Sequence, residues 1–290
     1  MDHVLGLFEQ HRGHLFGIAY RMVGSATEAE DLVQEVWLRW SSRVDLEVEH
    51  PRAFLAATIT HLSIDHLRKV KQQRLSYTGP WLPEPLVGPA PSPEDPTLMA
   101  QSLSAAFLLL LERLDPVERA VFLLREVFDY DYAEVATFTG KSEAHCRQIL
   151  KRARDHIHAG RPRPGASPER RQELLLAFVQ AVSGGDLAGI QRLLSDDIEF
   201  HSDGGGVTNA ALRVVTTPDK VGRMLLGLAK KMNPAWTLEM AWMGGEPGLL
   251  FKLDGQVVQA LSISADPNHI TAIYSVLNPH KLSHLNAAPS

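Results

Sequence analysis

The sequence has little cysteine, no excess of positive charge and no long apolar run. Cys146 is the one cysteine in 290 residues, so an internal disulfide is excluded. No apolar run approaches the roughly 20 residues that span a bilayer, and the first residues lack the order of a signal peptide. The composition, 44% hydrophobic and 22% charged, is typical of globular proteins. We therefore expect a cytoplasmic protein of two or three domains.

Common signatures of metal and nucleotide sites are also missing. The 13 histidines contain no HExxH grouping, and His156 and His158 lie two apart on a predicted helix, on different faces. The sequence has neither a phosphate-binding GxxxxGK loop nor a dinucleotide fingerprint. We therefore expect no metal and no cofactor.

The net charge of −5 limits how this chain can use nucleic acid. A protein that binds DNA alone is usually basic, because contacts to phosphates supply most of its affinity. The acidic balance therefore predicts that DNA contact depends on a protein partner, with basic residues used locally. It argues against a plain helix-turn-helix repressor that binds duplex DNA by itself.

A helix-turn-helix with a leading support helix is predicted over Leu114–His158. Asp115 precedes Pro116, with a glutamate three places on, which is typical of a capped helix start. Asp131 repeats this cap, and Gly140 supplies the left-handed turn that ends the second helix.

The third helix of this motif, after Ser142, has two distinct sides. Its apolar stripe contains Cys146, Ile149, Leu150, Ala153 and Ile157. The other faces carry His145, Arg147, Gln148, Lys151 and Arg152, among other charged residues. These residue types read base edges and neutralise phosphates. The alternative is an ordinary helical hairpin whose basic face is merely solvated.

Three helices are predicted before residue 75, and the second and third have candidate binding faces. The helix capped by Ser25 has an apolar stripe that ends at Trp40. Its opposite face includes Asp31, Gln34, Glu35 and Leu38. A leucine among acids is a candidate docking patch, and the alternative is an isolated surface leucine without a role, which is common. The helix from Pro51 ends in basic residues, which suit a nucleic-acid backbone and also the helix's own dipole.

Two linkers separate the remaining segments. Residues 76–101 are rich in proline and predict a semi-extended linker. A solvated linker gains nothing from a tryptophan, so we expect Trp81 to anchor on a neighbouring domain. After the second linker, two helices and several strand-like segments, among them IEFHSD and ALRVV, predict a curved antiparallel sheet with a further helix from Pro218 to Lys231.

The segments EAEDLVQEVWLRW, FLAATITHLSIDHLRK and LDPVERAVFLLREVFDYDYAEVA, followed by the basic third helix, resemble regions 2 and 4 of extracytoplasmic-function RNA polymerase sigma factors. This resemblance implies contacts with core RNA polymerase and with the −10 and −35 promoter elements. The implied polymerase contacts are Asp31, Gln34, Glu35 and Leu38. The loop Ser41 to His50 and the helix after it, with His61, Arg68 and Lys69, would meet the −10 element. His145, Arg147, Gln148, Lys151 and Arg152 would read the −35 element. Family members often have an Arg-Asn pair where this chain has Thr60-His61.

Three further motifs resemble signatures of the sigma-factor group that carries a C-terminal SnoaL-like domain, the SigJ type. They are WLPEP in the linker, DGGG and NPHKL. The implied interdomain and regulatory residues are Trp81, Pro83, Asp203, Gly204, Gly205, Gly206, Asn278, Pro279 and Lys281. The family's last motif usually has an aspartate at the position of His280, so no role of that carboxylate carries over.

The predicted fold class is multidomain: two all-α helical sigma domains followed by an α+β SnoaL-like cone. The expected boundaries are 1–75 for region 2, 76–101 for the WLPEP linker, 102–160 for region 4, 161–167 for the second linker and 168–285 for the cone. The predicted function is an alternative sigma factor that catalyses no reaction and is regulated in cis by its C-terminal domain. A small ligand in the cone is a further candidate partner.

The rival hypothesis is a SnoaL-like cyclase, hydrolase or isomerase tethered to a DNA-binding module. His201 and Asp203 lie two apart on a predicted strand and so point to one face. On an interior face they could act as acid and base. The alternative is that Asp203 begins a loop whose glycines allow a close approach of the Trp81 linker or of the helical domains.

Overall fold

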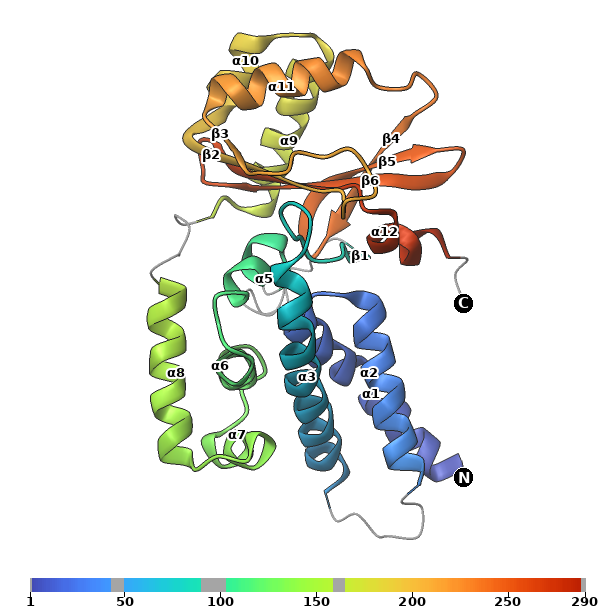
Figure 1. The fold of residues 1–290 in the computed structure, drawn as a ribbon, viewed down its shortest axis with the longest axis vertical. Coiled ribbons are helices and arrows are strands. Elements are labelled where there is room, and N and C mark those ends of the chain that lie inside the picture. The colour runs from blue at the N-terminus through green and yellow to red at the C-terminus, as the bar shows by residue number, and fades with distance from the viewer. Residues whose placement is uncertain (1, 43–49, 90–102, 159–164, 288–290) are drawn as a thin grey trace. The chain divides into compact units, whose positions relative to one another are not determined.

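The computed structural model describes residues 2–42, 50–89, 103–158 and 165–287 and divides into two compact units (Figure 1). We call them the helical unit, Met1–Leu75 with Leu108–Arg161, and the sheet unit, Ser76–Phe107 with Pro162–Ser290. Each unit is therefore built from two separate stretches of sequence. The predicted fold class, all-α domains followed by an α+β domain, is confirmed.

The helices up to residue 158 follow the predicted caps. They are α1 (Asp2–Val23), α2 (Ala26–Ser41), α3 (Pro51–Leu75), α5 (Ala105–Leu111), α6 (Pro116–Phe122), the π-helix η1 (Leu123–Val127), α7 (Tyr132–Thr139) and α8 (Glu143–His158). Asp115 and Asp131 each form a full capping box, and Gly140 ends α7 with φ 64°. The five predicted apolar residues of α8, Cys146 included, are all buried.

A buried arginine connects the two stretches of the helical unit. Arg119 of α6 donates to the carbonyl oxygens of Leu111 and Met22 and to the Glu112 carboxylate, at 2.6–3.0 Å. Arg74 of α3 also binds Glu112, at 2.6 Å. Burial raises the pKa of Glu112, but the two arginine charges outweigh burial and hold that pKa below its usual value. The carbonyl groups at the end of α1 thus receive donors from α3 and α6.

A second contact links α1 to the turn before α7. The ring nitrogen Nε2 of His14 lies 2.6 Å from the hydroxyl of Tyr130, and the Arg52 guanidinium lies over the Tyr130 ring. Burial, followed by the charges of Arg52, His11 and Arg21, lowers the pKa of His14 from 6.5 to about 4. The imidazole is therefore neutral at pH 7 and can accept a hydrogen bond from the Tyr130 hydroxyl.

Within the described residues, the sheet unit contains seven strands in the order β1-β4-β5-β6-β7-β2-β3. They are β1 (Val87–Gly88), β2 (Leu194–Asp203), β3 (Val215–Thr216), β4 (Thr237–Met243), β5 (Glu246–Leu253), β6 (Gln256–Ala265) and β7 (Ile270–Val276). The helices are α9 (Pro168–Ser183), α10 (Leu187–Leu193), α11 (Pro218–Lys230) and α12 (Pro279–Asn286).

The prediction of an antiparallel sheet is wrong for one pair of strands, because β2 and β7 run parallel. No turn joins these strands, so neither hairpin geometry nor hydrophobic pattern determines their relative direction. The predicted strand ALRVV is also shorter than expected, since only Val215 of that segment is in a strand.

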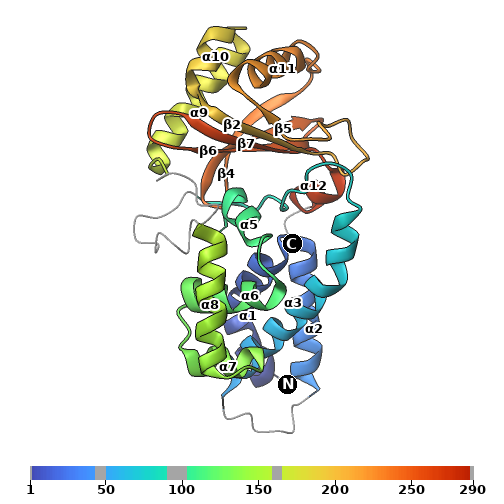
Figure 2. The ribbon, with the colours of Figure 1, turned by 60° about the vertical axis from the view of Figure 1, so that its left-hand side comes forward.

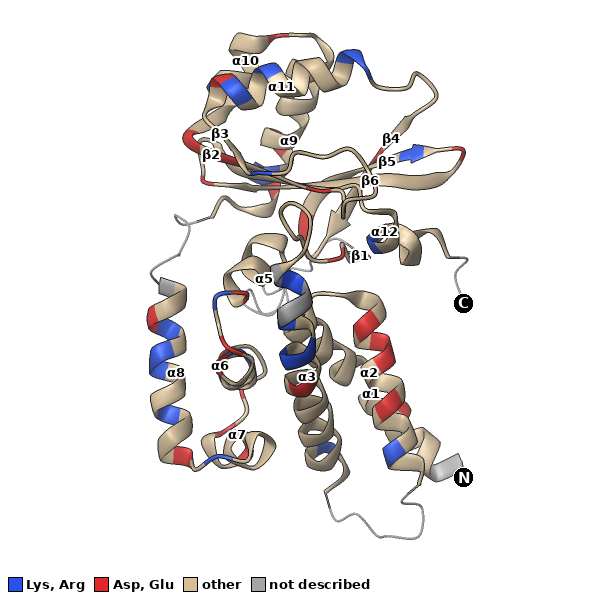
Figure 3. Ribbon diagram, in the orientation of Figure 1, with Lys and Arg blue, Asp and Glu red and all other residues tan. Residues whose placement is uncertain are grey.

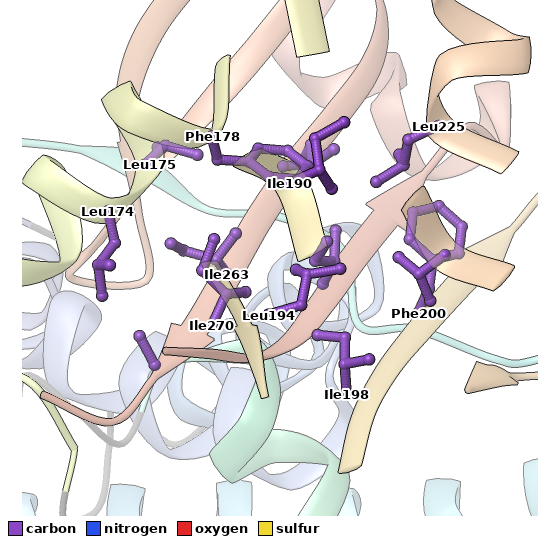
Figure 4. Packing of buried hydrophobic residues seen from close by; sticks show 14 of the residues in the cluster. Leu174, Leu175, Phe178, Ile190, Leu194, Ile198, Phe200, Leu225, Ile263 and Ile270 are labelled. Atoms are coloured by element: carbon purple, nitrogen blue, oxygen red, sulfur yellow. The ribbon is translucent and has the colours of Figure 1, made fainter. Parts of the chain in front are cut away.

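One face of the sheet carries the core. Figure 4 shows Leu174, Leu175 and Phe178 of α9 packed toward Phe200 and Ile263 of the sheet. Figure 2 shows α9, α10 and α11 over this face, with the linker and α12 on the other side. Side chains alternate along a strand, so Glu199, His201 and Asp203 lie opposite the core side chains Ile198 and Phe200.

Residues 43–49 of the predicted −10 loop, 90–101 of the first linker and 161–164 of the second linker lie outside the described residues. Within the described ranges, no helix is long and apolar enough to cross a membrane. The same ranges hold no cluster of three or more His, Cys, Asp or Glu side chains suited to a metal ion.

Candidate functional site

The linker after α3 forms part of the sheet unit. Its strand β1 pairs antiparallel with β4, joining Val87 to Met243 and Gly88 to Trp242. Next to this pairing, the Gly244 amide donates to the carbonyl oxygen of Leu86 at 2.9 Å. Backbone hydrogen bonds therefore fix residues 86–88 of the linker on the sheet.

The first part of the linker is held by Asp203, a fully buried carboxylate at the end of β2. Its oxygens accept hydrogen bonds from the Tyr77 hydroxyl at 2.6 Å and from the Leu82 amide at 2.8 Å. The Gly205 amide and the Lys281 ammonium also donate, at 3.0 and 2.8 Å. A buried carboxylate requires such partners, and here two of the four come from the linker.

Lys281 of α12 is the cation of this cluster. Besides Asp203, its ammonium donates to the carbonyl oxygen of Leu82, and it lies 5.0 Å from the ring centre of Tyr77 and 4.3 Å from that of Trp81. Charge pairing and cation–π contact thus act on the same short linker segment. We call this set of residues, Tyr77, Trp81, Leu82, Asp203, Asn278 and Lys281, the linker clamp.

Asn278 and the glycines complete the linker clamp. The Asn278 amide donates to the Tyr77 hydroxyl at 3.0 Å. Gly205 has φ 62°, and a Cβ there would lie 2.2 Å from Asn278 Nδ2. At Gly206 (φ 73°), a Cβ would lie 3.2 Å from Thr78 of the linker. Glycine is therefore required both for the backbone conformation and for the close approach of the linker.

The three signature motifs meet at the linker clamp, where the hydrogen bonds that join them connect residues 78 to 199 positions apart. Pro83 is buried beside the linker clamp, whereas Pro279 and His280 are exposed. His280, which stands where the family usually has an aspartate, therefore lies outside the linker clamp. Sequence reasoning missed Tyr77, whose pKa is raised by burial and by its hydrogen bond to Asp203. It also missed His284, which binds the Pro85 carbonyl oxygen at 2.8 Å. Neither residue belongs to a motif.

The acid–base pair expected by the rival enzyme hypothesis does not form. His201 and Asp203 do share a face, as predicted, but that face lies opposite the core cluster. His201 binds Glu199 at 2.9 Å and stacks on Tyr274, while the Asp203 carboxylate is occupied by four donors. The interpretation of the glycines as a close-contact loop agrees with this geometry.

The predicted DNA-contacting side chains lie on exposed helix faces. On α8, His145, Arg147, Gln148, Lys151 and Arg152 are all exposed. On α3, His61, Arg68 and Lys69 are exposed, while Thr60 is fully buried. Figure 3 shows basic residues along α8 and along the C-terminal half of α3.

The predicted polymerase contacts lie on α2, where Figure 3 shows a concentration of acidic residues. Asp31 and Gln34 are exposed, and Glu35 forms an ion pair with Arg39 at 2.9 Å. Leu38 is 61% exposed on this helix.

Comparisons with known proteins agree with this architecture. Family models match for sigma-70 region 2 at residues 7–74 and for sigma-70 region 4 at residues 104–157. The ECF RNA polymerase sigma factor SigJ of Mycobacterium tuberculosis is 36% identical over 95% of this chain and 92% of its own length. The probable ECF sigma factor SigI of the same species is 29% identical over 99% of this chain and 97% of its own length.

The sheet unit is included in this likeness. The crystal structure of M. tuberculosis SigJ superposes with a TM-score of 0.77 at 33% sequence identity, covering 96% of this chain and 98% of that one. The similarity therefore extends through both units and through the linker. The chain belongs to the extracytoplasmic-function (ECF) RNA polymerase sigma factors.

Proposed function

We propose that the sheet unit regulates this sigma factor in cis by holding the linker that joins its two promoter-binding parts. The observation that carries the proposal is the buried Asp203 carboxylate, which takes donors from Tyr77 and Leu82 of the linker and from Lys281. Binding residues 77–88 of the linker to the sheet unit shortens the free length that lets the two parts separate. Separation is needed because the −10 and −35 elements are distinct sites along the promoter.

The exposed helix faces are assigned to the partners of a sigma factor. The α2 face, with Asp31, Gln34, Glu35 and Leu38, would bind core RNA polymerase. His61, Arg68 and Lys69 of α3 would contact the −10 element, and the outer face of α8 would read the −35 element. Support comes from their exposure and from the contrast between an acidic α2 and a basic α8.

Binding of a small ligand in the cone would regulate the linker clamp. Ser202 and Ser275 are cross-strand neighbours on the core side of the sheet, and Gln259 donates to Ser275 at 2.9 Å. Ser202 directly precedes Asp203 in β2, and Ser275 of β7 lies three residues before Asn278. A ligand that recruits them would shift the strand ends that carry the linker clamp.

Transcription in vitro with reconstituted core enzyme tests the regulatory role. The comparison includes the full chain, Asp203→Asn and a chain that ends near Val276 and so lacks Asn278 and Lys281. Both changes release the same linker segment, so we expect them to alter promoter-specific yield in the same direction. Glu239→Gln, at an exposed ion pair of the same sheet, is the matched control. Equal yields from all four proteins would refute regulation through the linker clamp.

A further inference from the structure

The guanidinium of Arg147 on α8 lies over the ring of Tyr132, the first residue of α7. Its Cζ atom is 4.6 Å from the ring centre. The same side chain donates through Nη2 to Glu143 Oε2 at 2.8 Å, one turn earlier on α8. Arg147 is 54% exposed along its side chain, so these two contacts hold an arginine that is otherwise open to solvent.

The ring itself is held by a second cation. Arg125 of η1 lies 5.3 Å from the Tyr132 ring centre. Arg125 in turn donates to the Asp129 carboxylate and to the carbonyl oxygen of Tyr130, both at 3.0 Å. The π-helical turn at Leu123–Val127 carries Arg125, and such turns often occur at functional positions. The Tyr132 ring thus contacts Arg125, whose own position is fixed by Asp129 and Tyr130 of the loop before α7.

Support of this kind matters for an arginine because its side chain is long and loses much rotational freedom when it binds. Stacking uses the flat face of the guanidinium and leaves its in-plane N–H groups directed outward. Those groups match the O6 and N7 acceptors of a guanine edge. Arg147 is the fifth residue of α8, in the half of a recognition helix that contacts base edges.

We propose that Tyr132 is a positioning residue that orients Arg147 toward one guanine of the −35 element. The inference rests on the proposed role of α8 in reading that element. The start of α7 does not need the ring, because the Asp131 and Glu134 capping box already satisfies its first amide groups. The ring can therefore be altered while the helix keeps its cap.

The experiment measures binding of the holoenzyme to a panel of promoters in which each −35 base pair is replaced in turn. The variants are Tyr132→Phe, Tyr132→Leu, Arg147→Gln and the double variant Tyr132→Leu/Arg147→Gln. Arg154→Gln is the matched control, because that arginine of α8 pairs with the Glu126 carboxylate at 2.6 Å. Lys151→Gln reports separately on the DNA contact of α8.

We expect Arg147→Gln to lose the preference for guanine at one position by about 5- to 150-fold. Tyr132→Leu should lose about 2- to 5-fold of the same preference at the same position. Tyr132→Phe should keep it, because the stacking face is retained. Since the ring acts through Arg147, the double variant should bind like Arg147→Gln alone, and Arg154→Gln should leave the position unchanged.

Two results would overturn the positioning role while leaving α8 as a DNA reader. One is a uniform loss across all positions in Tyr132→Leu, and the other is a double variant clearly weaker than Arg147→Gln. A different result would refute the proposed role of α8 in reading the −35 element. In that result, holoenzymes with Lys151→Gln and with Arg147→Gln would both bind every promoter as tightly as the unmodified chain does.

Discussion

Replacing Lys281 by methionine tests whether the linker clamp is held by its buried charge pair. Methionine keeps most of the aliphatic length, so the main loss is the ammonium that binds Asp203 and Leu82. Breaking a buried ion pair by removing one partner costs about 3–5 kcal/mol. Asp203 keeps three other donors, so we expect the lower end, about 3 kcal/mol, which is roughly a 150-fold shift in an equilibrium.

The free-energy change is measured by urea denaturation of the full chain, and local opening by the rate of proteolysis within the linker. Lys252→Met is the matched control, because Lys252 and Glu239 form an exposed pair in the same sheet, whose loss costs under about 1 kcal/mol. Adding Asp203→Asn to Lys281→Met should recover part of the stability, since it removes the unpaired buried charge. The reasoning fails if Lys281→Met is no less stable than Lys252→Met and its linker is equally protected.

Three further predictions concern other parts of the chain. Gly205→Ala should destabilise the sheet unit by about 1–3 kcal/mol more than Gly185→Ala, as judged by denaturation. Both glycines have positive φ, but only at Gly205 does the added Cβ meet another atom within 4 Å. His14 has a pKa of about 4 in the folded chain and 6.5 in the unfolded chain. Its contribution to the free energy of unfolding is therefore fully present above pH 6.5 and is lost as the pH falls toward 4, because the unfolded chain binds the proton first. The free energy of unfolding should change by less than about 1.4 kcal/mol per pH unit in this range, because solvent screens the half-buried ring. His14→Gln should make the free energy of unfolding less dependent on pH, as measured by denaturation at several pH values. An unchanged pH dependence would contradict the lowered pKa of His14. Leu38→Asp should weaken binding to core polymerase by about 10-fold or more in a pull-down titration. Leu5→Asp, at an exposed leucine of α1, should leave that binding unchanged, and equal losses from both would contradict docking through α2.

Local features of the helices could be predicted from the sequence because each depends on neighbouring residues. The capping boxes at Asp115 and Asp131, the turn at Gly140 and the buried stripe of α8 follow from residues within one or two turns. The parallel pairing of β2 with β7 could not be predicted in this way, because it depends on the path of some 70 intervening residues.

The candidate site shows the same division. The motifs WLPEP, DGGG and NPHKL could be found in the sequence, and the glycines predicted a close approach. Tyr77 could not be identified, since it is an ordinary tyrosine before the motif and acquires its role only through Asp203 and Asn278. Arg119 could not be identified either, because its helix has an apolar stripe and a charged side, and nothing in the local pattern separates a buried cation from an exposed one.

The distance along the chain between the two halves of the linker clamp has a consequence for newly made protein. Leu82 and Lys281 are 199 residues apart, so at about 5–20 residues per second the ribosome needs roughly 10–40 s to reach the second after the first. Every stretch of the helical unit is synthesised well before Lys281. Each nascent chain thus passes through an interval in which its promoter-reading helices have been made and its linker clamp is still incomplete.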